Sequence, residues 1–310
     1  MLRDAPGPIR VVVVGDLAAD VVLAPERPLA RGTDVPGHVS IRQGGSAANT
    51  AGWVARLGAR ATLVCAVGRD GLGRALVAEM AARGVTVRAV RVAGERTARI
   101  GVVVAPDGER SFVADRGAAQ QLRPDHLRAA WFARAEVLHV PAYSLLGDPL
   151  GRAGMAAIAM AREAGARVSV DLASAEPLLA RGRSAALDLL RAAAPDLLLA
   201  NESEVSQLLG VPDASPLLEI APAVVVKRGA LGARVLDRGS GSAVDVVTRP
   251  VATADTTGAG DAFDAGFLVG WLGAVRSGAP AAVALRRGAV AGNRAAARQL
   301  ATPRRELALR

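Results

Sequence analysis

The sequence has 310 residues, of which 51% are hydrophobic and only 3% aromatic, and its formal net charge is +9. No apolar run reaches the roughly 18 residues of a membrane-spanning helix, and a single cysteine excludes a disulfide or zinc framework. Arginines are scattered over the whole chain and aromatic residues are too few to stack on bases, so we expect a soluble cytoplasmic protein that does not bind nucleic acid.

Short β-branched runs alternate along the chain with alanine-rich stretches. The runs are continuously apolar, as in a parallel sheet that is covered on both faces. Predicted strands cover residues 9–16, 61–68, 135–142, 166–173, 196–201 and 221–229, and predicted helices cover 46–58, 71–84 and 149–165. A strand pair at 232–247 and two helices at 258–275 and about 280–301 follow. The alternation predicts one α/β domain over 1–310, with a doubly wound, mostly parallel sheet flanked by helices.

Two segments break this alternation and have no helix to cover them. Residues 17–42 combine prolines and glycines with short strands, and residues 97–116 predict a hairpin with PDG at its turn. We interpret both as parts of a small β-sheet that projects over the main sheet and acts as a lid. Its exposed strand edges favour a homodimer formed through the lid.

The stretch DTTGAGDAFDAGF, residues 255–267, places small residues directly before an apolar helix. Gly258, Ala259 and Gly260 leave backbone N–H groups of the helix N-terminus uncovered, and these donors form an anion site with the helix dipole. Such a site suits the charge that develops on a transferring phosphoryl group. Asp261 follows in the first turn, where it is either a helix cap or a base that accepts a proton from an attacking hydroxyl.

Other phosphate-binding motifs are excluded by their spacing. The only lysine, Lys227, stands in VVVKRGALG rather than in GxxxxGK[ST], so the chain is not a P-loop ATPase. The first strand ends in GDLAAD rather than GxGxxG, which gives no support to a dinucleotide site.

With these residues in view, the chain resembles the ribokinase (PfkB) family of carbohydrate and nucleoside kinases over nearly its whole length. DTTGAGDAFDAGF resembles the C-terminal signature of that family, and GGSAANTAGWVARLGARATLVCAVGRDGLG, residues 44–73, resembles the N-terminal one. The resemblance implies a ribokinase-like fold with a β-sheet lid, ATP and Mg²⁺ as cofactors, and a sugar or nucleoside as the acceptor.

The resemblance also implies roles for single residues. Asp261 matches the catalytic base, and residues 258–260 match the anion hole. Asp20 matches an aspartate that holds substrate hydroxyls, and its carboxylate can accept two hydrogen bonds from a diol. The implied substrate contacts are Asp20, Gly44, Gly45 and Asn49. A simple helix-turn position is the alternative for Asn49.

The nucleotide side is implied in the same way. Asn201 and Glu204, in NESE, match an element near the triphosphate, where Glu204 would reach Mg²⁺ through water; a solvated helix start is the alternative. The implied nucleotide contacts are Asn201, Glu204, Lys227, Gly229, Gly232 and Asn293.

Three departures from the family pattern bear on cofactor and substrate. Ser46 follows the glycine pair where ribokinases have a lysine, and HVPAY at 139–143 lacks a glutamate expected of ribokinases. The segment ATPRREL, 301–307, replaces a glycine-alanine stretch typical of members activated by a monovalent cation. Asp255 and Thr257 remain candidate ligands for such a cation, so a K⁺ requirement is left open.

The acceptor itself is decided by few residues. Arg116 follows the lid hairpin and either faces the pocket, which would suit an acidic or phosphorylated sugar, or lies on the surface. Tyr143 either stacks on a sugar or base or closes the core edge. We therefore place a sugar or sugar acid first, a nucleoside second, and a non-catalytic ligand-binding protein third.

Overall fold

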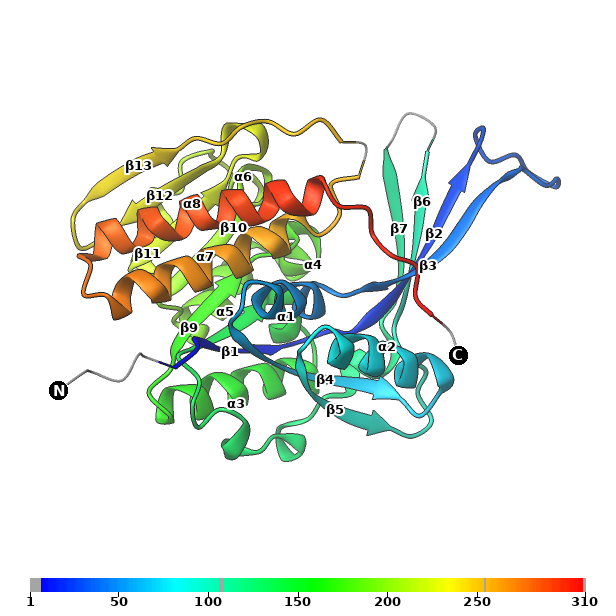
Figure 1. Ribbon diagram of the computed structural model, residues 1–310, viewed down its shortest axis with the longest axis horizontal. Helices are drawn as coiled ribbons and strands as arrows, with labels where there is room; N and C mark the ends of the chain where they lie inside the picture. The colour runs from blue at the N-terminus through cyan, green and yellow to red at the C-terminus, as the bar shows by residue number, and fades with distance from the viewer. Residues whose placement is uncertain (1–6, 106–108, 254, 309–310) are drawn as a thin grey trace.

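The computed structural model of the chain describes residues 7–105, 109–253 and 255–308, whose strands form two sheets (Figure 1). The larger sheet has nine strands in the order β13-β12-β11-β10-β9-β8-β1-β4-β5. All neighbours from β5 to β11 are parallel, while β12 and β13 are antiparallel. Its strands are β1 (Arg10–Val14), β4 (Arg60–Gly68), β5 (Thr86–Val92), β8 (Val137–Pro141), β9 (Arg167–Asp171), β10 (Leu197–Asn201), β11 (Ala223–Lys227), β12 (Ala233–Asp237) and β13 (Ser242–Val246).

Both faces of this sheet are buried, because successive side chains of a strand point to opposite sides. In β1, Val11 and Val13 belong to one apolar cluster and Val12 and Val14 to the other. The first cluster is covered by α1 (Ser46–Arg56), α2 (Gly71–Ala82), α7 (Ala259–Arg276) and α8 (Ala281–Leu300). The second is covered by α3 (Leu150–Glu163), α4 (Ala175–Leu179), α5 (Arg183–Ala193) and α6 (Glu202–Leu209). The predicted doubly wound α/β fold is confirmed.

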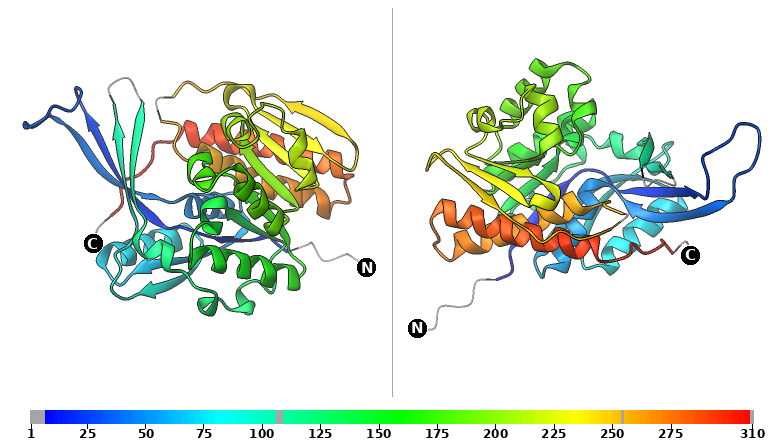
Figure 2. Two further views of the ribbon diagram at one scale, coloured as in Figure 1. Left: turned by 180° about the vertical axis from the view of Figure 1, so that it is seen from behind. Right: turned by 90° about the horizontal axis from the view of Figure 1, so that it is seen from above.

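The smaller sheet projects from the body, as the view from above shows (Figure 2). Its strand order is β3-β2-β6-β7, with β2 (Ala18–Pro25), β3 (Gly37–Gly44), β6 (Arg99–Val104) and β7 (Arg110–Asp115). The two segments predicted to break the alternation therefore build this sheet, although β3 continues two residues beyond position 42. The predicted PDG turn, residues 106–108, lies outside the described residues.

Several elements were not predicted from the sequence, among them the edge strand β5 and the helices α4 and α5. The strand β5 reads TVRAVRV and mixes arginines with valines, because it is an edge strand whose residues are mostly only partly buried. The helix α5 has just three buried residues, Ala186, Leu190 and Ala193, and two of them are alanines, so few large apolar residues mark it. Predicted strands are also up to four residues too long, since their flanking residues leave the sheet.

The topology brings the carboxyl ends of the parallel strands together at one end of the large sheet. The chain adds β4 and β5 on one side of β1 and β8 to β11 on the other, and ligands of open α/β sheets bind where the order reverses in this way. Asp171, Asn201 and Lys227 are the last residues of β9, β10 and β11, so their side chains gather at the same edge. Among the described residues, no helix has the length and apolar character needed to cross a bilayer.

Candidate active site

Asp261 lies where α7 meets α1. Its Oδ1 accepts a hydrogen bond from Ser46 Oγ at 2.7 Å, and its Oδ2 accepts one from Asn49 Nδ2 at 2.8 Å. The N-cap of α7 is Gly258, so the helix is not capped by Asp261. The carboxylate is instead held by the first turn of a different helix, as a positioned reacting group would be.

The environment of Asp261 raises its pKa to about 6. Burial is the largest cause because it disfavours the charged form, and the negative charge of Asp171 adds to it. The hydrogen bonds from Ser46 and Asn49 act in the opposite direction. A carboxylate with this pKa is ionised near neutral pH and is basic enough to take up a proton during a reaction.

The start of α7 provides backbone N–H groups close to Asp261, of which the Ala259 amide also donates to the Thr256 carbonyl at 3.2 Å. Gly258 has φ +76, a left-handed conformation that side chains rarely adopt, and it turns the chain into the helix. At Gly260, an added Cβ would come 3.6 Å from Lys227 Nζ. The helix N-terminus and the Lys227 ammonium therefore lie side by side, and both provide N–H donors of the kind that bind an anion.

Lys227 is held by two buried carboxylates. Its Nζ donates to Asp171 Oδ1 at 2.7 Å and to Asp264 Oδ1 at 3.1 Å, and both aspartates are almost fully buried. Burial disfavours the charge of Lys227, but Asp171, Asp264 and Glu204 outweigh it and raise its pKa, so the ammonium stays protonated. The sequence did not single out Asp171 or Asp264. An aspartate within the apolar helix sequence AFDAGF was the signal available for Asp264.

Asn201 and Glu204 form a capping box at the start of α6. Asn201 Oδ1 accepts a hydrogen bond from the backbone N–H of Glu204, and Glu204 Oε2 accepts one from the backbone N–H of Asn201, both at 2.8 Å. Burial and the nearby Asp171 raise the pKa of Glu204 to about 7. Within the described ranges, no group of three or more His, Cys, Asp or Glu residues could hold a metal ion. A magnesium ion here would therefore need phosphate and water ligands as well.

A cleft of about 340 Å³ leads away from the anion site between α8 and the loop after β11. The sequence candidates that line it are Lys227, Gly229, Gly232, Ala259, Gly260 and Asn293. Gly232 has φ +92, and a Cβ there would lie 2.1 Å from the Val246 carbonyl oxygen. Asn293 reaches the cleft wall, but its Nδ2 donates to the Val246 carbonyl at 3.0 Å and so ties α8 to the end of β13.

Asp20 lies near the start of β2, in the smaller sheet. A Cβ on Gly44 would lie 2.0 Å from Asp20 Oδ1, so only glycine fits beside this carboxylate. Gly45 has φ +96 and forms the N-cap of α1, the helix that carries Asn49. Arg304, which the sequence did not single out, donates from Nη2 to Asp20 Oδ2 and to the Gln43 carbonyl, both at 2.7 Å. Nothing local marks Arg304, because its partners are far away in sequence.

Arg116 and Tyr143 lie against each other, and Arg116 is not an isolated surface residue. The guanidinium carbon of Arg116 is 4.2 Å from the centroid of the Tyr143 ring, and Nη1 is 3.9 Å from Asp16 Oδ2. Burial raises the pKa of Tyr143. The pair therefore forms one wall near Asp16, which in turn accepts from the Ala47 amide at the start of α1.

Nitrogen donors surround the two candidate ligands for a monovalent cation. Asp255 pairs with Arg110 at 3.3 Å and with Arg42 at 3.5 Å. The Thr257 carbonyl accepts from Gln299 Nε2 at 2.9 Å, and Thr257 Oγ1 accepts from Arg110. The oxygen atoms that could coordinate a cation therefore already have positively charged or hydrogen-bonding partners within the protein.

The comparisons with known proteins agree with this geometry. The family model described as "pfkB family carbohydrate kinase" matches residues 8–304. A fructokinase of Klebsiella pneumoniae is 31% identical over 271 residues, which cover 84% of each chain. Two crystal structures are also similar. An adenosine kinase from Sinorhizobium meliloti has a TM-score of 0.82 at 25% identity and covers 98% of both chains. A fructokinase from Vibrio cholerae, bound to fructose, ADP and calcium, has a TM-score of 0.76 at 26% identity over 94% of this chain and 92% of its own. The chain belongs to the pfkB family of carbohydrate kinases and is a phosphotransferase with an alcohol group as acceptor.

Proposed function

We propose that the chain transfers the γ-phosphate of ATP to a primary hydroxymethyl group of a sugar or sugar acid, with Asp261 as the base. The observation that carries this proposal is the position of the Asp261 carboxylate. It is held by Ser46 and Asn49 and lies in the first turn of α7, directly after Ala259 and Gly260, which line the 340 Å³ cleft.

Each residue has a distinct role in the proposed reaction. Asp20 and Asn49 orient the acceptor by hydrogen bonds to its hydroxyls. Asp261 removes the hydroxyl proton as the acceptor oxygen bonds to the γ-phosphorus and the bond to the ADP oxygen breaks. The N–H groups of residues 258–260 and the Lys227 ammonium stabilise the charge on the phosphoryl oxygens. The lid covers the acceptor and keeps water away.

The residues of the cleft fit a nucleotide. Its walls include the apolar side chains of Val251, Phe263 and Leu300, and glycines at 229 and 232 allow the backbone to approach a ligand closely. A magnesium ion would neutralise part of the phosphate charge. Glu204 would hold one of its water ligands through Oε1, because Oε2 accepts the Asn201 amide.

The charge around the acceptor side favours a sugar or sugar acid. Arg116 lies near Asp16, Arg110 near Asp255 and Arg304 near Asp20. Such guanidinium groups bind carboxylate or phosphate groups well. A nucleoside is the second candidate, supported by the similarity to an adenosine kinase. Tyr143, already stacked on Arg116, offers little aromatic surface for a base.

Three further predictions from the sequence accompany the proposal. They are a cytoplasmic location, a homodimer formed through the lid, and an open question of K⁺ activation, for which Asp255 and Thr257 are the candidate ligands. The exposed apolar side chains Leu23, Val39, Phe112 and Val113 on the lid strands support a contact there.

The test is ADP release by the purified protein with Mg²⁺ and ATP across sugars, sugar acids and nucleosides. We expect a strong response to one sugar or sugar acid, and none from Asp261→Asn with the same acceptor. A response to a nucleoside alone would favour the second candidate. Silence across the panel, with ATP still bound, would point to a ligand-binding protein instead.

A further inference from the structure

A second cavity, of about 470 Å³, lies on the outer side of the active site. It is bounded by α1, by the end of α2, and by the last turn of α8 with the segment 302–305 that follows it. We call it the α1–α2 groove. Its volume lies within the range of small-molecule sites. None of the roles proposed above uses its outer part.

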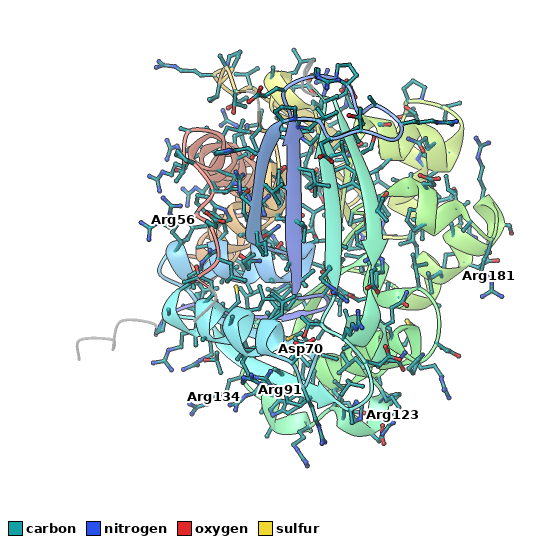
Figure 3. The ribbon with its side chains drawn as sticks, turned by 90° about the vertical axis from the view of Figure 1, so that its right-hand side faces the viewer. Arg56, Asp70, Arg91, Arg123, Arg134 and Arg181 are labelled. Atoms are coloured by element: carbon teal, nitrogen blue, oxygen red, sulfur yellow. The ribbon has the colours of Figure 1, made fainter. Side chains whose placement is uncertain are left out.

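The groove is rich in positive charge. Among the described residues that line it, Arg56, Arg83, Arg304 and Arg305 face a single carboxylate, Glu79. Glu79 pairs with Arg83 at 2.7 Å, and Arg304 pairs with a carboxylate outside the groove, so an excess of positive charge remains. Figure 3 shows Arg56 reaching outward beside α8 and the C-terminal segment. Arginines that converge on one cavity suit an anion with planar oxygen groups, such as a phosphate.

One chain of hydrogen bonds connects the groove to the proposed base. Arg83 Nη1 donates to Gln43 Oε1 at 2.8 Å, and Gln43 Nε2 donates to Asn49 Oδ1 at 3.1 Å. Asn49 Nδ2 then donates to Asp261 Oδ2 at 2.8 Å. Gln43 is only 4% exposed, and its Nε2 also donates to the Gly44 carbonyl at 2.9 Å. Arg83 is thus one of the groups that set the orientation of the Gln43 amide, and through it that of Asn49.

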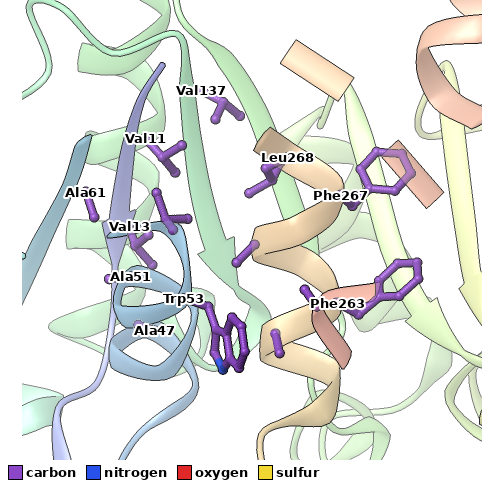
Figure 4. Packing of buried hydrophobic residues seen from close by; sticks show 14 of the residues in the cluster. Val11, Val13, Ala47, Ala51, Trp53, Ala61, Val137, Phe263, Phe267 and Leu268 are labelled. Atoms are coloured by element: carbon purple, nitrogen blue, oxygen red, sulfur yellow. The ribbon is translucent and has the colours of Figure 1, made fainter. Parts of the chain in front are cut away.

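A second chain leads from the groove to the anion site. Trp53 Nε1 donates to Gln299 Oε1 at 3.0 Å, and Gln299 Nε2 donates to the Thr257 carbonyl at 2.9 Å. Thr257 directly precedes Gly258, the N-cap of α7. Figure 4 shows the Trp53 ring standing between α1 and α7. The guanidinium of Arg56 covers this ring, 4.6 Å from its centroid. A ligand that binds Arg56 would therefore disturb the contacts of Trp53 and Gln299 that hold Thr257 at the start of the anion site.

We propose that the α1–α2 groove binds a small phosphate monoester and that its occupation lowers turnover. The phosphate oxygens take the donors of Arg83, Arg56 and Arg305. Arg83 then leaves Gln43 Oε1, the Gln43 amide holds Asn49 less firmly, and Asp261 keeps Ser46 but loses the fixed position of its second donor, Asn49. The product of the proposed reaction is itself a phosphate monoester, so this inference names a form of feedback that rests on the proposed function.

Binding is tested first, without any assay of turnover. Isothermal titration of the full chain, saturated with ADP to fill the nucleotide cleft, uses a hexose 6-phosphate, AMP and inorganic phosphate as probes. We expect a monoester to bind, and Arg305→Met to weaken it by about tenfold or more, since a charge-assisted hydrogen bond is lost. Arg74→Met is the matched control, because Arg74 is an exposed arginine of α2 outside the groove. Equal affinity in all three proteins would overturn the proposal.

The link to catalysis is tested with the bound probe. The monoester should lower kcat and leave KM for ATP unchanged. Arg305→Met should keep the basal kcat and lose this inhibition, while Arg83→Met should also lower the basal kcat because Gln43 is released. Inhibition that is purely competitive with the acceptor, together with a raised acceptor KM in Arg305→Met, would make the groove part of the acceptor site and refute the inference. If no acceptor is found, the binding experiment still decides whether the site exists.

Discussion

Replacing Asp261 by Asn tests the proposed base most directly. The amide keeps the size of the side chain and can still accept from Ser46 Oγ, but it cannot take up a proton. A general base contributes about 10²–10⁴-fold to the rate, which corresponds to about 3–5 kcal/mol of the barrier. We expect kcat to fall by that factor. Nucleotide affinity should stay within about twofold, because Asp261 does not line the cleft.

The pH dependence provides an independent measure of the same group. With a pKa of about 6, the carboxylate is mostly protonated at pH 5 and mostly ionised at pH 7, so kcat/KM should rise with pH through that value. Ser46→Ala removes a hydrogen bond that lowers this pKa, and its midpoint should therefore shift to higher pH. The control is Ser40→Ala, in the lid strand β3.

The assay is coupled ADP release between pH 4.5 and 8.5, with ADP affinity measured separately by titration calorimetry. A kcat of Asp261→Asn within tenfold of the unsubstituted protein would refute the role of Asp261. So would a profile that is flat through pH 6 while ADP binding is intact.

The remaining predictions address neighbouring groups. Lys227→Met should destabilise the fold by about 3–5 kcal/mol in urea unfolding, since it leaves two buried carboxylates without their partner; a loss below about 1 kcal/mol would contradict the ion-pair network. Turnover should be equal in K⁺ and in tetramethylammonium, because Arg110 already neutralises Asp255, and a several-fold stimulation by K⁺ would show that reasoning to be wrong. Gly44→Ala should raise the acceptor KM by about tenfold or more without changing KM for ATP, since its Cβ would displace Asp20; an unchanged acceptor KM would argue against Asp20 as a substrate contact.

Local patterns explain which features were predicted from the sequence. Continuous apolar runs marked the central strands because those strands are buried on both faces, and β5 was missed because it lies at an edge. Glycines at 45, 232 and 258 have positive φ, so a required backbone conformation is visible in the residue type itself. Sequence analysis therefore identified these glycines as candidate site residues. Their functional roles remain predictions.

The residues that were missed act through partners far away in the chain. Asp171 meets Lys227 across 56 positions, and Arg304 meets Asp20 across 284. Neither contact leaves a periodic or spaced signal near the residue itself. The identity of the acceptor depends on such contacts. For this reason the sequence alone ranked a sugar or sugar acid before a nucleoside but kept both as candidates.

The segment that carries Arg304 also bears on how the molecule matures. It lies outside the helices and strands and runs along the lid strand β3, where the Leu307 amide donates to the Ile41 carbonyl at 2.7 Å. Contacts that close so long a stretch of chain form late in folding, and segments tied by few bonds open first. A nascent chain can thus complete both sheets before Asp20 receives its partner. The acceptor side is therefore complete only when this segment has docked, with Leu307 buried in the core and Arg304 on Asp20.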